Sequence, residues 1–240
     1  MSSLHSLKGV RSRIEDLSLE LEELCCFPED EFRAIIKEVG FSCTLCGRCC
    51  TREFNDHVFL LDDDLERARR IRPEAVVPAP YFELCDQHGI FYVSGYSLKC
   101  KENGECVFLE NNRCIIYEER FRICRIYPYM LHREYGDDGM RGWRQISGLN
   151  EHGDYGREIT DDECTRIIQE TTSYEKDFLK KEIGFYRCCL QYFGEHGLRP
   201  VRKVYDQKMR DFDDGRAVTV FVFNGKGFDR HDLRKSDYYM

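Results

Sequence analysis

The segment Cys43-Thr-Leu-Cys46-Gly-Arg-Cys49-Cys50 places four cysteines within eight residues. A C-x2-C step brings two sulfurs to one side of a tight loop, as a shared metal ion or iron–sulfur cluster requires. Side chains of adjacent residues diverge in an extended segment, so we expect Cys49 and Cys50 to serve different positions. The segment therefore predicts a metal centre carried on a loop.

Four later cysteines extend this pattern, at Cys100, Cys106, Cys114 and Cys124. Eight thiols can supply two centres with four ligands each, or one cluster with spare thiols, and the sequence leaves both arrangements open. The candidate metal ligands are Cys43, Cys46, Cys49, Cys50, Cys100, Cys106, Cys114 and Cys124.

The cysteine content also bears on the cellular compartment. The chain has 14 cysteines in 240 residues, no apolar signal-peptide core at its start and no run of 18 apolar residues. We therefore expect a cytoplasmic protein with no membrane span, in which clustered cysteines bind metal rather than form disulfides. A formal net charge of -8 argues against nonspecific nucleic-acid binding.

The apolar pattern predicts an α+β fold, with helices packed around a small antiparallel sheet and a loop-borne cysteine metal centre. Helices are expected over about 14–24, 28–39, 65–71, 161–168 and 173–193. Strands are expected over 57–61, 89–96, 143–146 and 217–223, with a hairpin of 106–109 and 114–117, and a loose tail from 228. We expect an N-terminal helical segment (1–40), a cysteine-cluster domain (41–170) and a C-terminal helix and strand extension (171–240).

The combined cysteine pattern, C-x2-C-x2-C-C followed by C-x5-C-x-F-L-x4-C-x-I-Y and C-R-x-Y-P, resembles the CxxCxxCC family of zinc- or iron-chelating, YkgJ-like cysteine cluster proteins. The resemblance covers about residues 41–130, and it implies metal or cluster binding without naming a substrate. Two positions depart from the family: Phe121 stands where Pro is usual, and a further cysteine near a glycine is replaced at best by Cys164. Some members methylate lysines of flagellin, but this chain has no strand followed by a G-x-G-like loop.

The spacing favours iron over zinc. The run C-x2-C-x2-C matches the segment that binds a [4Fe–4S] cluster in bacterial ferredoxins, with a further ligand from elsewhere. Tetrathiolate zinc is the alternative, but the paired C-x2-C knuckles usual for it are missing. Arg120 and Arg125, which lie within the family motif, are expected to stabilise the negative charge of the cofactor.

These features predict an iron–sulfur protein that transfers electrons, or supports a redox or modification reaction, on an unidentified protein or redox partner. A zinc-stapled interaction module without catalysis and a relative of protein lysine methyltransferases are the alternatives. Whether Cys85 or Cys164 is an extra ligand stays open, and four other cysteines are expected to act as small apolar residues: Cys25, Cys26, Cys188 and Cys189.

Overall fold

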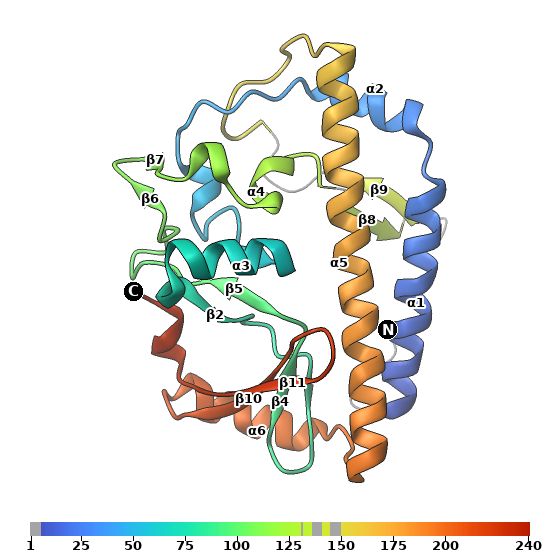
Figure 1. Ribbon diagram of the computed structural model, residues 1–240, viewed down its shortest axis with the longest axis vertical. Helices are drawn as coiled ribbons and strands as arrows, with labels where there is room; N and C mark the ends of the chain where they lie inside the picture. Colours follow the sequence, from blue (N-terminus) through green and yellow to red (C-terminus); the bar gives the residue numbers. More distant parts are fainter. Residues whose placement is uncertain (1–5, 131, 136–140, 145–149) are drawn as a thin grey trace.

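The computed structural model describes residues 6–130, 132–135, 141–144 and 150–240. Its fold is α+β, as predicted, with small sheets lying among helices (Figure 1). The helices are α1 (Leu7–Cys26), α2 (Glu29–Val39), α3 (Asp62–Ile71), α4 (Arg122–Ile126), α5 (Asp161–His196) and α6 (Arg202–Asp213). None of the described helices is both long and apolar enough to span a membrane.

The longest element is α5, whose 36 residues run beside α1 along one side of the molecule (Figure 1). The sequence predicts two helices here, but no Gly or Pro separates 168 from 173, and the helix continues through Thr171. Its N-cap is Thr160, whose capping box with Glu163 places Asp161 in the first turn rather than at the cap. The predicted division at residue 170 falls inside this helix, and the three-segment organisation stays a prediction.

Helix α2 ends at Gly40, and this end is held close to the segment that leads into α5. Gly40 adopts φ +51°, and a Cβ placed there would lie 2.3 Å from the carbonyl oxygen of Arg157. Only glycine permits both this backbone conformation and this approach. The close contact brings the start of the cysteine loop to the N-terminal end of α5, more than a hundred residues away in sequence.

Within the described residues the strands form four small sheets, and one of these contains a parallel pair. In the first sheet, β1 (Phe59–Leu60), β5 (Tyr96–Leu98) and β2 (Val76–Pro78) pair antiparallel in the order β1-β5-β2. The second has the order β11-β10-β4-β3, with β10 parallel to β4. Its strands are β3 (Leu84–Cys85), β4 (Phe91–Val93), β10 (Val218–Phe223) and β11 (Phe228–Leu233). The two hairpins are β6 (Leu109–Glu110) with β7 (Arg113–Cys114), and β8 (His132–Tyr135) with β9 (Arg141–Arg144).

Two strand expectations differ from the structure. The tail expected to be loose forms β11, because the Asn224 side chain accepts hydrogen bonds from the backbone N–H groups of Lys226 and Gly227 and so closes a hairpin with β10. The strand expected over 89–96 divides into β4 and β5 at Gly95, whose Cα lies against the ring of Phe59. Residues 145 and 146 of another expected strand lie outside the described residues.

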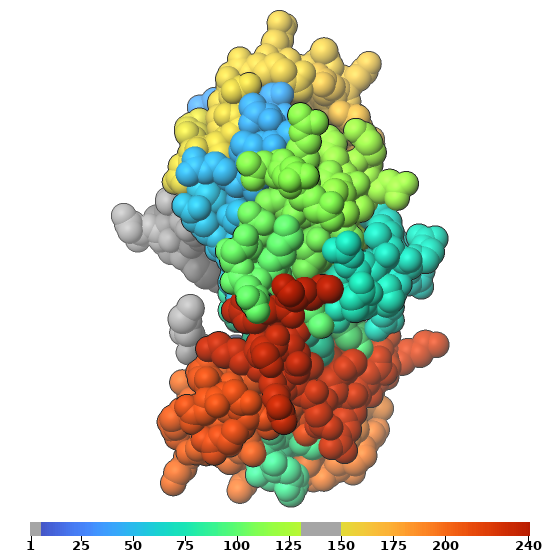
Figure 2. Space-filling model, turned by 90° about the vertical axis from the view of Figure 1, so that its left-hand side faces the viewer, coloured from blue at the N-terminus to red at the C-terminus, as the bar shows by residue number. Residues whose placement is uncertain are grey.

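The end of the chain returns to the cysteine region (Figure 1). The N–H of Cys100 donates to the carbonyl of Tyr238 at 3.0 Å, and the N–H of Met240 donates to the carbonyl of Cys100 at 2.9 Å. These bonds fix Cys100 between the last residues and the turn that leads to Cys106. In the side view, the cysteine loop, the segment around α4 and the residues before α5 gather in the upper half of one face (Figure 2).

Candidate metal centre

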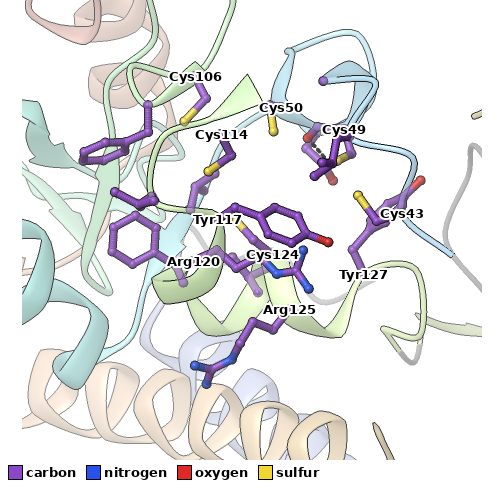
Figure 3. A pocket seen from close by; sticks show the side chains of 18 of the residues that line it. Cys43, Cys49, Cys50, Cys106, Cys114, Tyr117, Arg120, Cys124, Arg125 and Tyr127 are labelled. Carbon is purple, nitrogen blue, oxygen red and sulfur yellow. Dashed lines mark hydrogen bonds between the residues drawn. The ribbon is translucent and has the colours of Figure 1, made fainter. Parts of the chain in front are cut away.

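A cavity of about 300 Å³ lies between the cysteine loop, the β6–β7 hairpin, α4 and the start of α5. Figure 3 shows sulfur atoms arranged around this space, with the side chains of Tyr117 and Arg120 among them. Six of the eight predicted ligands line it: Cys43, Cys49, Cys50, Cys106, Cys114 and Cys124.

The cysteine loop is shaped by Gly47, which has φ +75° and precedes a short 3-10 helix, Arg48–Cys50. A Cβ at Gly47 would lie 3.2 Å from a methyl carbon of Leu109, so the loop rests directly on the β6–β7 hairpin. The 3-10 turn brings Cys49 and Cys50 to the same cavity, with a hydrogen bond between their side chains. The segment is helical rather than extended, so both residues line one cavity, and their service at different ligand positions stays a prediction.

The β6–β7 hairpin and the cysteine loop hold Cys106 and Cys114 in the wall. The N–H of Cys106 donates to the carbonyl of Cys50 at 2.7 Å, and Cys114 pairs with Leu109 across the hairpin. The turn contains Asn111 and Asn112 at φ +49° and +59°, the left-handed conformation that the sequence predicts for this pair.

Helix α4 supplies Cys124 and is tied to α3 by a buried carboxylate. Asp64, 1% exposed, accepts hydrogen bonds from the N–H of Arg122 at 3.0 Å and from the Arg67 guanidinium at 2.6 Å. The N–H of Arg122 belongs to the first turn of α4, so Asp64 satisfies a donor that the short helix leaves open. This bond sets the position of α4, and therefore of Cys124, relative to α3.

Four of the cavity thiols lie in surroundings that raise their pKa: Cys49, Cys106, Cys114 and Cys124. A hydrogen bond to Cys50, followed by burial, raises the pKa of Cys49 far above its usual range. Burial raises the pKa of Cys106 to about 12 and that of Cys124 well above its usual value. Arg120 opposes these shifts at Cys49 and also at Cys114. A metal that binds here must displace protons, and its charge then stabilises the thiolates.

Two predicted ligands, Cys46 and Cys100, lie outside this cavity. Cys46 is exposed, and although burial alone would raise its pKa, hydrogen bonds from the backbone at Arg48 and Gly153 lower it. Cys100 is buried opposite Cys106, and burial raises its pKa while the nearby Arg52 opposes that rise. It lines a second, smaller cavity of about 20 Å³ that also contacts three of the other cysteines: Cys49, Cys50 and Cys106.

The spacing of the thiols tests which group they could hold. Among the residues that the structure describes, no three Cys, His, Asp or Glu side chains come close enough together to bind a single metal ion. The six cavity thiols are instead spread around a wider space, which suits a group of several atoms better than one ion. Thiolates are soft ligands that select zinc, copper(I) and iron–sulfur clusters.

The cysteines outside the predicted ligand set do not line this cavity. Cys85 is buried in the core beside Asp86, and Cys164 donates from its sulfur to the carbonyl of Arg33 at 3.8 Å. Of the cysteines expected to be small apolar residues, Cys189 is buried and Cys188 is half-buried on α5. The other two, Cys25 and Cys26, are exposed at the end of α1, contrary to that expectation.

Comparison with known proteins agrees with this geometry. Residues 42–145 match the model of the CxxCxxCC family, which is described as "Putative zinc- or iron-chelating domain". These residues are similar to the CxxCxxCC family and make up less than half of the chain. The family description supports metal binding and leaves the choice between zinc and iron open.

A relative occurs in Methanocaldococcus jannaschii, the uncharacterized protein MJ0661, which is 28% identical to this chain over 104 residues. The aligned part covers 42% of this chain and 51% of that protein, so the chain spans about half the length of the relative. No solved structure matches the chain.

Sequence reasoning missed several residues that line the large cavity. Arg157 and Arg166 line the cavity from the approach to α5 and from its second turn, and Tyr129 contributes to the same wall. Arg157 and Arg166 lie far beyond the motif in sequence, and the close approach of Gly40 to Arg157 gives no sequence signal.

A buried histidine was missed as well. His152 is 7% exposed, stacks on Tyr127 with ring centroids 5.3 Å apart and lies 4.7 Å from the ring of Phe54. Neither of its ring nitrogens has a hydrogen-bond partner, and the buried hydroxyl of Tyr127 is also unpartnered in the described part of the chain. The adjacent Gly153 contacts the cysteine loop, so His152 lies just behind the metal-binding segment.

Proposed function

We propose that the large cavity holds an iron–sulfur cluster, with [4Fe–4S] as the favoured form, and that the protein acts in electron transfer or in a redox or modification reaction. The observation that carries this proposal is the arrangement of six thiols around one space of about 300 Å³, without the close grouping that a single ion needs among the described side chains. Such a cluster supplies a one-electron redox centre bound through cysteine thiolates.

The six cavity cysteines are the first ligands to consider, and Cys46 and Cys100 stay candidates at its margins. A [4Fe–4S] cluster takes four thiolates, so two of the six would remain as thiols or bind another centre. The raised pKa of Cys49 and of Cys124 marks thiols that keep their protons unless a metal replaces them.

Arg120 is placed to compensate the charge of the bound group. Its guanidinium lies over the Tyr117 ring at 4.1 Å, lines the cavity and opposes the rise that burial causes in the pKa of Cys114. A fixed positive charge beside a cluster stabilises its reduced form and raises its reduction potential. Arg125, the second predicted cofactor residue, also lines the cavity, but its guanidinium lies on the α5 side, 3.9 Å from Glu170.

Exposed apolar residues beside the cysteines support exchange with a partner protein. Leu45 is 41% exposed next to Cys46, and Ile115 is 49% exposed next to Cys114. An apolar surface near a redox centre lets a partner approach closely without a charged layer between them. All fourteen cysteines are free thiols, which fits a reducing compartment such as the cytoplasm.

The proposal is tested by purifying the protein without oxygen and measuring iron, acid-labile sulfide and zinc per chain in one sample. We expect iron and sulfide in equal amounts, together with broad absorbance near about 400 nm from thiolate-to-iron charge transfer. A colourless protein that contains stoichiometric zinc and no sulfide would overturn it.

A zinc centre is the second candidate, and the small cavity favours it. Four cysteines line that space of about 20 Å³, the number of ligands that a tetrathiolate zinc site needs, although their side chains would have to move closer together to share one ion: Cys49, Cys50, Cys100 and Cys106. A tetrathiolate zinc ion there would be closed to solvent and would tie the C-terminal residues to the cysteine loop without catalysis. Zinc that resists chelation, in a sample without sulfide, would favour this function.

A further inference from the structure

The wall of the large cavity has an unusual charge. The whole chain carries 44 Asp and Glu against 36 Lys and Arg, yet the described residues that line the cavity include four arginines and no Asp or Glu. The four are Arg120, Arg125, Arg157 and Arg166. An enclosed space with charge of one sign focuses its field and attracts ions of the opposite sign.

The arginines form two groups. Arg120 acts on the thiols, since its charge opposes the rise in the pKa of Cys49 and of Cys114. The other three are exposed and come from α4, the segment before α5 and α5 itself: Arg125, Arg157 and Arg166. Compensation of the charge of the proposed metal group therefore accounts for Arg120. It does not account for the other three arginines, which lie at the mouth of the cavity, where it opens to solvent.

The carboxylates near the mouth neutralise these charges only in part. Arg157 pairs with Glu163 at 3.1 Å, in a bond that faces solvent, and Arg125 reaches Glu170 only at 3.9 Å. Within the described residues, Arg166 has no ion-pair partner. Exposed pairs of this kind contribute little, so an anion that all three guanidinium groups can reach would compete with them well.

The same part of the cavity has an apolar and aromatic lining. Phe41 packs edge-on against Tyr127 with ring centroids 5.7 Å apart, and Ile123 and Ile167 line the space with them. The hydroxyl of Tyr127 is buried and lacks a hydrogen-bond partner within the described chain. A cavity of about 300 Å³ is of the size that holds small ligands, with an apolar wall and a few polar groups that fix orientation.

We propose that this mouth binds a small organic anion, whose carboxylate or phosphate group lies between Arg125, Arg157 and Arg166. The apolar part of the ligand lies against Phe41, Tyr127 and Ile167, and the Tyr127 hydroxyl supplies a further hydrogen bond. The anion lies beside the cysteines, where a substrate of a redox or modification reaction would have to be. The arginines that line the cavity are present whichever metal the cysteines hold, so this proposal goes beyond the proposed function and can hold if that function fails.

The test is calorimetric titration of the protein, as purified without oxygen, with phenyl phosphate, benzoate, benzamide and inorganic phosphate. Phenyl phosphate or benzoate should bind at least about tenfold more tightly than uncharged benzamide, because charge-assisted hydrogen bonds to arginine are stronger than neutral ones. Comparison of the two anions distinguishes a phosphate ligand from a carboxylate ligand. Inorganic phosphate should bind more weakly than phenyl phosphate, because it cannot use the aromatic wall.

The matched variants are Arg166→Gln and Arg187→Gln, two exposed arginines on the same helix of which only the first lines the cavity. Arg166→Gln should weaken binding of the aromatic anion about tenfold or more, while Arg187→Gln leaves it unchanged. Metal content, measured in each sample, should be equal in both variants. Equal binding of benzamide and the anions, equal effects of the two substitutions, or no binding of any probe would overturn the proposal. Absence of iron would count against the cluster alone.

Discussion

Cys100 lies opposite Cys106 in an antiparallel bridge, yet only Cys106 lines the large cavity. Residues that face each other in this way direct their side chains to the same side of the pair, and both thiols line the small cavity. The pair therefore forms the partition between two cysteine-lined spaces. Cys106 is available to either space, whereas Cys100 is available only to the smaller one.

The first prediction concerns the ligand set. Cys124→Ser should remove most of the bound metal, because Cys124 lies in the cavity wall and a serine oxygen is a poor ligand for a soft metal. Cys188→Ser, a half-buried cysteine on α5 outside the cavity, is the control and should leave the metal content unchanged. The measurement is the metal content per chain of each variant after anaerobic purification. Equal loss of metal in both variants would mean that the ligand set is assigned wrongly.

A second substitution compares a cysteine outside the cavity with a cysteine in the cavity wall. Cys46 is exposed and lies outside the cavity, so Cys46→Ser should lower metal affinity less than Cys124→Ser does, although both belong to the same motif. Chelator competition gives the two affinities. Complete metal loss in Cys46→Ser would show that the loop closes over the metal and brings Cys46 into the ligand set.

A third prediction concerns Arg52. This side chain lies near Cys100, which raises the pKa of Arg52, and donates to the Tyr239 hydroxyl at 2.8 Å, so it joins the C-terminal residues to the cysteine region. If Cys100 is a ligand, Arg52→Gln should weaken metal binding by about 10- to 100-fold, as loss of an outer partner of a ligand commonly does. Arg210→Gln, an exposed arginine near the end of α6, serves as the control. Unchanged affinity in Arg52→Gln would remove Cys100 from the ligand set.

The buried Asp64 gives a prediction on stability. Asp64→Ala should lower the free energy of unfolding by about 2–3 kcal/mol, because it removes hydrogen bonds to the Arg67 guanidinium and to the first turn of α4. Asp63→Ala, an exposed residue of the same turn, should cost less than about 1 kcal/mol. Urea unfolding of both variants measures the difference, and equal midpoints would contradict the role given to Asp64.

A buried carboxyl predicts how stability depends on pH. Burial, followed by the nearby Glu83, raises the pKa of Glu182 from 4.5 to about 7. Between these values the folded protein holds a proton that the unfolded chain has released, so this contribution to stability is full in acid and is lost as the pH rises through about 7. The loss between pH 5 and pH 8 should be about 2–3 kcal/mol.

Glu182→Gln should remove most of this pH dependence, since the amide is neutral at every pH and can keep the hydrogen bond to Ser94. The variant should be more stable than the parent at pH 8, as judged by urea unfolding at pH 5, 6.5 and 8. Glu15→Gln, on the exposed face of α1, should follow the parent at each pH. If the parent and Glu182→Gln show the same change in stability between pH 5 and pH 8, Glu182 does not carry the effect.

The sequence could predict the cysteines that line the large cavity but not the shape of the centre. The spacing of the motif identified all six cysteines that line the cavity, and Asn111 and Asn112 marked the turn that holds two of them. It could not separate Cys46 and Cys100 from the others, because that depends on a 3-10 turn and on the return of the chain end to Cys100.

The four arginines that line the cavity were predictable only in part, for a different physical reason. Arg120 and Arg125 lie within the motif, whereas Arg157 and Arg166 reach the cavity because Gly40 packs on the backbone of Arg157. A contact between residues more than a hundred positions apart depends on tertiary packing, and neither hydrophobic period nor capping residues indicate it. The α+β class followed from local patterns, which explains why it could be predicted while the positions of Arg157 and Arg166 could not.

Iron K-edge X-ray absorption of the anaerobically purified protein tests the central claim most directly, because it reports the neighbours of the metal itself. If the six-cysteine cavity holds an iron–sulfur cluster, the spectrum contains sulfur neighbours and an iron–iron scattering path, and the iron–iron path is lost in Cys124→Ser. Absence of an iron edge, together with a zinc K-edge spectrum that shows four sulfurs at about 2.3 Å and no second metal, would contradict the account.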